Sequence, residues 1–158
     1  MRASLELRDL DMTDLSSADT FPHGILYTML RVTDLDASIA FYRDGLGMSE
    51  VRRETFPDGR FTLVFMGYDD NPDGPTIELT WNWDTKTYSH GTGYGHIALA
   101  VRDIYGACAR LADMGAKVVR DPGPMTFAPE ETGHREEIAF VTDPDGYRIE
   151  LIGHAEER

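Results

Sequence analysis

The sequence contains an internal duplication, and this feature constrains the fold more than any other. The segment ILYTMLRV, which contains Tyr27, aligns with HIALAV, which begins at His96, 69 positions later. The tripeptide IEL closes each copy and has Glu78 or Glu150 at its centre. A nearly constant separation of matched segments is the signature of repeated structural units. The chain is therefore expected to fold as two similar modules.

Each copy has the same predicted order of elements: one strand, one helix and three further strands. Both helices begin after an aspartate, Asp34 or Asp103, and end at a glycine, Gly47 or Gly115, which are common helix caps. In residues 60–68, the apolar residues Phe61, Leu63 and Phe65 alternate on one face, as they do in a strand. The predicted strands are residues 25–32, 49–56, 60–68 and 76–82 in the first copy and 95–101, 116–121, 136–143 and 147–152 in the second. This order predicts an α+β fold of two βαβββ modules.

Several segments lie outside these units. The first 24 residues are polar and weakly patterned, and Pro22 and Gly24 mark their end. A long irregular loop carrying three prolines is expected at residues 121–137. His90 and His154 are expected to lie on the surface. The predicted boundaries are an N-terminal extension at 1–24, a first module at 25–83, a linker at 84–94, a second module at 95–153 and a tail at 154–158.

Composition and charge exclude several functional classes. Of the 158 residues, 41% are apolar and 27% are charged, as expected for a globular protein. The net charge of −13 leaves no basic surface for nucleic acid or an anionic membrane, and no apolar run is long enough to span a bilayer. Cys108 is the single cysteine and is expected to be a buried structural thiol. A cytoplasmic location fits this lack of disulfides.

Polar residues recur at equivalent positions of the two copies. Glu78 and Glu150 interrupt apolar strands, and His96 lies in another. A buried carboxylate is costly unless it is paired, hydrogen-bonded or bound to a metal. One imidazole and two carboxylates suit a divalent cation. Alternatively, each glutamate could face solvent, because strands alternate between a buried and an exposed face. The duplication favours the metal interpretation, since both copies retain the glutamate.

Five blocks of the sequence together resemble glyoxalase I of the vicinal oxygen chelate superfamily. They are TMLRV, FYRDGLGM, IELTWNW, YGHIALAV and DPDGYRIELI, in this order, and the match covers residues 25–152. The resemblance implies two βαβββ modules whose curved mixed sheets enclose a metal cleft. It also implies a homodimer that builds each active site from both subunits.

The resemblance assigns roles residue by residue. Three of the family's four metal positions match Glu78, His96 and Glu150, and the fourth falls on Tyr27 instead of the histidine or glutamine of relatives. Glu150 is the implied catalytic base, and Glu78 is a ligand that could serve the other face of the substrate. The implied substrate-binding residues are Arg31 and Asn82 for glutathione and Phe56, Phe61, Leu63 and Phe65 for an apolar wall. These four apolar residues could equally be core.

The implied activity is isomerisation of the hemithioacetal of methylglyoxal and glutathione to S-D-lactoylglutathione. The protein would then be a lyase that serves methylglyoxal detoxification. The implied cofactor is one divalent metal per site, nickel or zinc, with cobalt as a further option, and glutathione is the co-substrate. Two alternatives stay open. One is another vicinal-oxygen-chelate lyase or epimerase acting on a different substrate. The other is a homologue that binds a small molecule without turnover.

Tyr27 is the departure from the family pattern that bears on metal binding. A phenol has a pKa near 10 and ligates well only as a phenolate. Tyr27 could bind the metal in that form, or it could hydrogen-bond a metal-bound water as a neutral phenol. A third outcome is that the site has lost its metal. The acidic loop at residues 121–137 is a second departure, and it would suit a different or restricted substrate.

Overall fold

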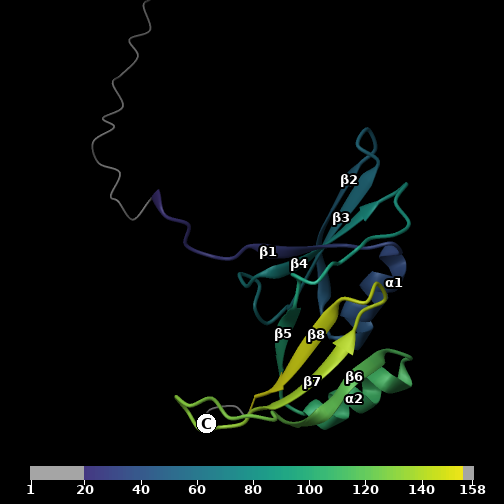
Figure 1. The fold of residues 1–158 in the computed structure, drawn as a ribbon. Helices are drawn as coiled ribbons and strands as arrows, with labels where there is room; N and C mark the ends of the chain where they lie inside the picture. Colours follow the sequence, from purple (N-terminus) through teal and green to yellow (C-terminus); the bar gives the residue numbers. More distant parts are fainter. Residues whose placement is uncertain (1–19, 155–158) are drawn as a thin grey trace, which may run out of the picture.

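The structure, a computed structural model, describes residues 20–154 and consists of two four-stranded mixed sheets (Figure 1). The strand order is β1-β4-β3-β2 in the first sheet and β5-β8-β7-β6 in the second. The outer strands β1 and β5 run parallel to their neighbours, and the other pairs are antiparallel. The predicted α+β fold is confirmed. Most of the expected N-terminal extension (1–19) and of the tail (155–158) lies outside the described residues.

Both sheets are assembled from the same sequence of elements. The first comprises β1 (Tyr27–Arg31), α1 (Leu35–Ala40), η2 (Phe41–Gly45), β2 (Ser49–Phe56), β3 (Phe61–Gly67) and β4 (Thr76–Asn82). The second comprises β5 (His96–Val101), α2 (Ile104–Asp113), β6 (Lys117–Pro124), β7 (Glu137–Thr142) and β8 (Arg148–Gly153). None of the helices between residues 20 and 154 is long and apolar enough to cross a membrane.

The two helical segments begin alike and end differently. Asp34 and Asp103 cap them by accepting hydrogen bonds from the amides of Ala37 and Gly106, both at 2.9 Å. The first helix, predicted to continue to Gly47, widens after Ala40 into the π-helical turn η2. A π turn holds one more residue per hydrogen-bonded ring than an α turn. The side-chain pattern of this segment gave no sign of that change.

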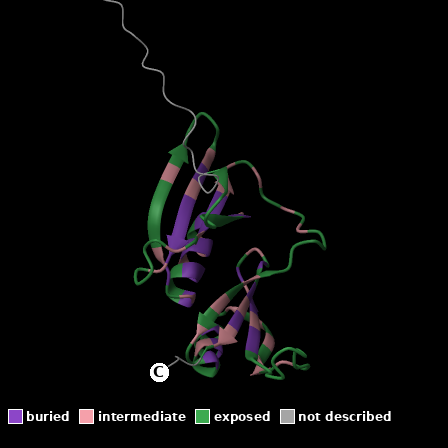
Figure 2. Ribbon diagram, turned by 90° about the vertical axis from the view of Figure 1, so that its left-hand side faces the viewer, coloured by how far each residue is buried: buried purple, intermediate pink, exposed green. Residues whose placement is uncertain are grey.

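One apolar core joins the two modules. Val64, Met66 and Leu79 of the first sheet and Leu111 of α2 belong to the same buried cluster as Ile149 of the second sheet. Figure 2 shows buried positions along the inner strands, whereas β2 is largely exposed. Cys108 is buried at 4% exposure, as predicted. The helices cover one face of each sheet, and we call the opposite face the open face.

The turn between β7 and β8, residues 143–147, locks the modules together. Asp143 accepts a hydrogen bond from the hydroxyl of Tyr42 at 2.8 Å. Asp145 accepts hydrogen bonds from the amide and the hydroxyl of Thr33, at 3.1 and 2.6 Å. Tyr147 donates its hydroxyl hydrogen to the carbonyl oxygen of Arg31 at 2.8 Å. The end of β1 is therefore fixed by the second module.

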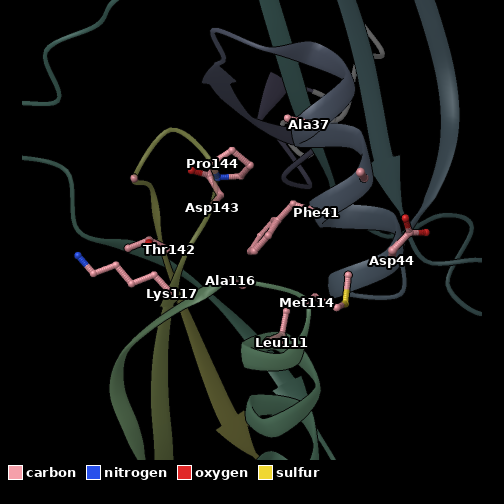
Figure 3. A pocket seen from close by; sticks show the side chains of 13 residues that line it. Ala37, Phe41, Asp44, Leu111, Met114, Ala116, Lys117, Thr142, Asp143 and Pro144 are labelled. Atoms are coloured by element: carbon pink, nitrogen blue, oxygen red, sulfur yellow. The ribbon is translucent and has the colours of Figure 1, made fainter.

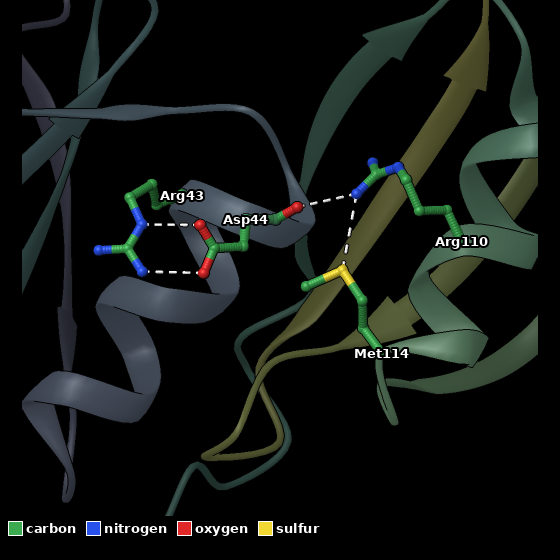
Figure 4. Close-up of polar contacts among 4 residues, drawn as sticks. All are labelled: Arg43, Asp44, Arg110 and Met114. Atoms are coloured by element: carbon green, nitrogen blue, oxygen red, sulfur yellow. Dashed lines mark hydrogen bonds and ion pairs between the residues drawn. The ribbon is translucent and has the colours of Figure 1, made fainter.

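Helix α2 adds a second connection next to a cavity. Arg110 donates to the carbonyl oxygens of Asp44 and Gly45 at 2.8 and 2.7 Å, and Figure 4 shows it between Asp44 and Met114. The neighbouring cavity of about 760 Å³ lies between η2, the end of α2 and the β7–β8 turn (Figure 3). Phe41 and Leu111 line it, and none of the predicted site residues does. The cavity therefore belongs to the module junction.

The expected irregular loop at residues 121–137 is shorter in the structure, because β6 continues to Pro124. Two irregularities in the β6–β7 pairing, on either side of Arg120, let the prolines fit the strand. The Arg120 guanidinium donates to the carbonyl oxygens of Gly123, Pro124 and Ile138. The irregular segment is thus confined to residues 125–136.

Candidate active site

The predicted site residues of the first sheet share its open face. Glu78 pairs with Met29 of β1 and Phe65 of β3, and Ile77 and Leu79 on either side of it point into the core. Because side chains alternate along a strand, Tyr27, Arg31, Asn82, Phe61 and Leu63 also lie on the open face. Phe56 of β2 joins them through its pairing with Phe61.

The second sheet brings a histidine and a carboxylate together on its own open face. His96 begins β5, and Glu150 lies two residues along the neighbouring strand β8, opposite Ala98. The His96 Nε2 atom is 2.9 Å from Glu150 Oε2. The side chains are 39% and 14% exposed, so solvent reaches the imidazole more than the carboxylate. A cation approaching this face would meet one nitrogen and one carboxylate oxygen.

Glu78 occupies the equivalent position in the first sheet and is more deeply buried. It is 6% exposed. Its Oε1 accepts a hydrogen bond from the Thr80 hydroxyl at 2.6 Å, and Thr80 is itself 8% exposed. This hydrogen bond compensates part of the cost of burying the carboxylate. Glu78 is held by its own strand, whereas Glu150 contacts the histidine of a neighbouring strand.

Tyr27 occupies the position of His96 in local geometry as well as in sequence. The Tyr27 ring meets Phe65 edge to face, with 5.4 Å between centroids and 77° between planes. The His96 ring meets Phe140 in the same way, with 5.1 Å between centroids and 76° between planes. Phe140 of β7 pairs with Glu150, just as Phe65 of β3 pairs with Glu78. Tyr27 is 44% exposed. The phenol therefore lies on the open face, where the imidazole of the second module lies.

The two half-sites lie on separate sheets. Tyr27 and Glu78 belong to the first, and His96 and Glu150 belong to the second. Within residues 20–154, no three histidine, cysteine, aspartate or glutamate side chains come together closely enough to hold one metal ion. Each open face therefore presents a partial set of metal donors.

The predicted substrate residues of the first sheet form a polar end and an apolar patch. Asn82 donates its side-chain amide to the hydroxyl of Tyr88 at 2.9 Å. Arg31 lines a cavity of about 220 Å³ together with Tyr88. Phe56 and Phe61 stack with 4.5 Å between ring centroids. The structure places these groups on one face, and both aromatic and polar contacts are available to a ligand there.

Arg52, Thr80 and Tyr88 contact predicted site residues, and sequence analysis did not identify them. The Arg52 guanidinium lies 4.0 Å above the Phe65 ring. Because Arg52 and Glu54 are two residues apart in β2, the sequence could have suggested that Arg52 lies on the open face. Thr80 in a strand and Tyr88 in a linker carry no such signal, because these residue types are common at such positions. His90, expected on the surface, is half-buried, and its ring stacks on Tyr147 with 4.1 Å between ring centroids.

Comparisons with known proteins agree with this architecture. A "Probable lactoylglutathione lyase" of Synechocystis is 52% identical over 128 residues, which are 81% of this chain and 93% of the relative. A "Lactoylglutathione lyase" of Neisseria meningitidis is 51% identical over 81% of this chain and 88% of the relative.

Solved structures give the same result. Glyoxalase I from Zea mays superimposes with a TM-score of 0.76 at 37% identity over 84% of this chain, and this chain spans 45% of the maize chain. The trypanothione-dependent glyoxalase I of Leishmania major has a TM-score of 0.68 at 38% identity, over 84% of this chain and 87% of that one. The family model of the Glyoxalase/Bleomycin resistance protein/Dioxygenase superfamily matches residues 24–151. The chain belongs to this superfamily.

Proposed function

We propose that this protein is a lactoylglutathione lyase, which isomerises the hemithioacetal of methylglyoxal and glutathione to S-D-lactoylglutathione. The observation that carries the proposal is the His96–Glu150 pair on one open face, with Glu78 at the equivalent position on the other. The family membership and relatives about half identical that bear this name support it.

The donor set fits one divalent metal per site. Glu78, His96 and Glu150 would hold it, because a neutral imidazole and two carboxylates suit nickel, zinc and cobalt. Such a metal would supply Lewis acidity toward the oxygens of the substrate. The metal's identity is chosen by geometry and availability, and these three residues accommodate any of the three ions.

A homodimer supplies the complete site. Each open face carries only part of the donor set, and no metal-binding cluster of three such side chains forms within the described part of one chain. Placing the first sheet of one subunit against the second sheet of its partner would unite Glu78 with a His96–Glu150 pair. The exposed apolar residues Met29 and Tyr27 on the open face would then be covered.

The reaction requires one proton to move between neighbouring carbons. Glu150 removes the proton from the carbon that bears sulfur and returns it to the adjacent carbonyl carbon, while the hydroxyl proton passes to the other oxygen. The first carbon is thereby oxidised to a thioester and the second is reduced to an alcohol, so no external oxidant is needed. A carboxylate within reach of both carbons supplies typically 10²- to 10⁴-fold of the rate.

The first sheet would bind the substrate. Arg31 is suited to hold a carboxylate of glutathione, because a guanidinium donates in a fork geometry. Asn82, oriented by Tyr88, contacts the same tripeptide. The apolar residues Phe56, Phe61, Leu63 and Phe65 surround the small group derived from methylglyoxal.

Tyr27 would act as a neutral phenol next to the metal. It is 44% exposed and contacts the ring of Phe65 edge to face. Glu78, His96 and Glu150 would then be three protein ligands, the number that catalytic zinc sites commonly use. The phenol can then orient a water molecule or a substrate oxygen by hydrogen bonding.

The test is thioester formation from methylglyoxal and glutathione by chelator-stripped protein that is reloaded separately with nickel, cobalt and zinc. Turnover should appear only with metal. Glu150→Gln should keep the fold and lower kcat by about 10²- to 10⁴-fold. Stoichiometric metal without turnover would favour another lyase or epimerase of the superfamily, and failure to bind metal would favour a binding protein.

A further inference from the structure

We propose that Thr80 is a positioning residue that fixes Glu78 in place and so leaves proton transfer to Glu150. This inference rests on the proposed function. Its first support is the short hydrogen bond of 2.6 Å from the Thr80 hydroxyl to Glu78 Oε1. Both side chains are buried, at 8% and 6% exposure, so water competes little for this bond. Glu78 is thereby confined to one orientation.

The second support is the difference between the two modules. Thr80 pairs with Arg31 two residues beyond the Glu78–Met29 pair, and Ile152 pairs with Ala100 two residues beyond the Glu150–Ala98 pair. Ile152 therefore stands where Thr80 stands, but it has no hydroxyl. Of the two glutamates, which are equivalent by the internal duplication, Glu78 has a hydroxyl anchor within its own strand and Glu150 has none.

The third support is the partner that Glu150 has instead. Its carboxylate lies 2.9 Å from His96 Nε2. That nitrogen can either ligate a metal or hydrogen-bond to the carboxylate, because it has only one position for a proton or a metal. When His96 binds a metal, Glu150 would lose this contact, whereas the Thr80–Glu78 hydrogen bond would stay intact. Of the two carboxylates at the metal, Glu150 would then lack an anchor within its own strand, so it is the one that can turn toward the substrate carbon.

Four variants distinguish the effect of the Thr80 hydroxyl from the effect of side-chain packing. Thr80→Val removes the hydroxyl at nearly constant volume, and Thr80→Ser retains it. Ile152→Thr introduces a hydroxyl two residues after Glu150, and Ile152→Val is its isosteric control. Metal affinity is measured by calorimetry without substrate, kcat and KM by thioester formation, and folding by thermal unfolding.

We expect Thr80→Val to weaken metal binding by about 10- to 100-fold, the usual effect of losing a partner of a metal ligand, and Thr80→Ser to bind as wild type does. Ile152→Thr should bind metal normally and lower kcat about tenfold relative to Ile152→Val, with KM unchanged, because its base is now tethered. Wild-type metal affinity in Thr80→Val would overturn the proposal. An equal loss of metal affinity in Thr80→Val and Thr80→Ser would also overturn it, and so would an equal kcat in the two Ile152 variants.

The two arms of the experiment also separate this inference from the proposed function. If the wild-type protein binds metal but does not isomerise the hemithioacetal, the proposed function fails. The calorimetric comparison of the Thr80 variants uses no substrate, so it still decides whether Thr80 anchors Glu78.

Discussion

At the scale of single residues, the structure contains one buried polar atom whose removal should cost nothing. The Ser38 hydroxyl is fully buried and has no hydrogen-bond partner in the described part of the chain. Burying an unpaired hydroxyl opposes folding. Ser38→Ala should therefore leave the free energy of unfolding unchanged or raise it by up to about 1 kcal/mol.

Urea unfolding checks this expectation. Ser49→Ala is the matched control, because the Ser49 hydroxyl donates to Asp69 at 2.9 Å on the surface. A loss of more than about 1 kcal/mol in Ser38→Ala would mean that the hydroxyl has a partner, since that is the usual net worth of a hydrogen bond.

Tyr27 gives a second prediction at this scale, because it occupies the position of an imidazole. Tyr27→His should bind metal at least about tenfold more tightly than wild type, since neutral imidazole is a better ligand than neutral phenol. Tyr27→Phe should keep the wild-type metal affinity and lower kcat. Calorimetry with nickel and thioester assays measure both. A large loss of metal affinity in Tyr27→Phe would instead identify Tyr27 as a direct ligand.

At the scale of elements, the β6–β7 hairpin depends on one side chain. Arg120 joins the carbonyl oxygens of Gly123 and Pro124 to that of Ile138 across the hairpin. Arg120→Met should leave these oxygens without the guanidinium, so amide hydrogens of residues 125–138 should exchange faster. Arg135→Met removes an exposed positive charge from the same loop and serves as the control. Equal exchange in both variants would show that Arg120 is no anchor.

The same scale shows how far the sequence could predict the structure. The predicted bounds of β2 and β4 agree with the structure, because turn-forming residues, Gly47 and the segment DDNPDGP, precede these strands. The π-helical turn was not predictable, since the burial pattern changes little when a helix widens by one residue per turn. The extension of β6 through Pro122 was missed because prolines predict loops, whereas an irregular pairing accommodates them.

For the candidate site, the sequence could predict the residues and their shared faces but not their partners. The duplication predicted that Tyr27 and His96 are equivalent, and their matching contacts with Phe65 and Phe140 agree with this. The Thr80–Glu78 hydrogen bond depends on a rotamer and on burial, which a linear pattern does not encode. The roles of these residues in metal binding and catalysis stay predictions.

At the scale of the whole molecule, the module junction should respond to pH through Asp143. Burial raises the pKa of the Asp143 carboxyl above its usual value and outweighs the hydrogen bonds from Tyr42 and the backbone. The folded state therefore binds this proton more readily than the unfolded chain, so the contribution of Asp143 to stability rises as pH falls through the raised pKa. This contribution to stability declines as the pH increases.

Urea unfolding of wild type and Asp143→Asn between pH 5 and 8 tests this. At pH 7 the variant should be less stable by about 1–3 kcal/mol, because an amide cannot accept all the hydrogen bonds that the carboxylate accepts. The difference should widen as the pH is lowered. A difference that narrows would mean that the pKa of Asp143 is lowered in the folded state.

The proposal that two chains share each site is tested most directly by mixing two inactive variants. Glu78→Gln and Glu150→Gln, co-expressed with different tags, would form a heterodimer in which one site carries both substitutions and the other carries neither. Each homodimer should be nearly inactive, and the mixture should recover about a quarter of the wild-type thioester-forming activity. A purified heterodimer that recovers no activity would contradict a site built from the two open faces of different subunits. A protein that does not dimerise would contradict it as well.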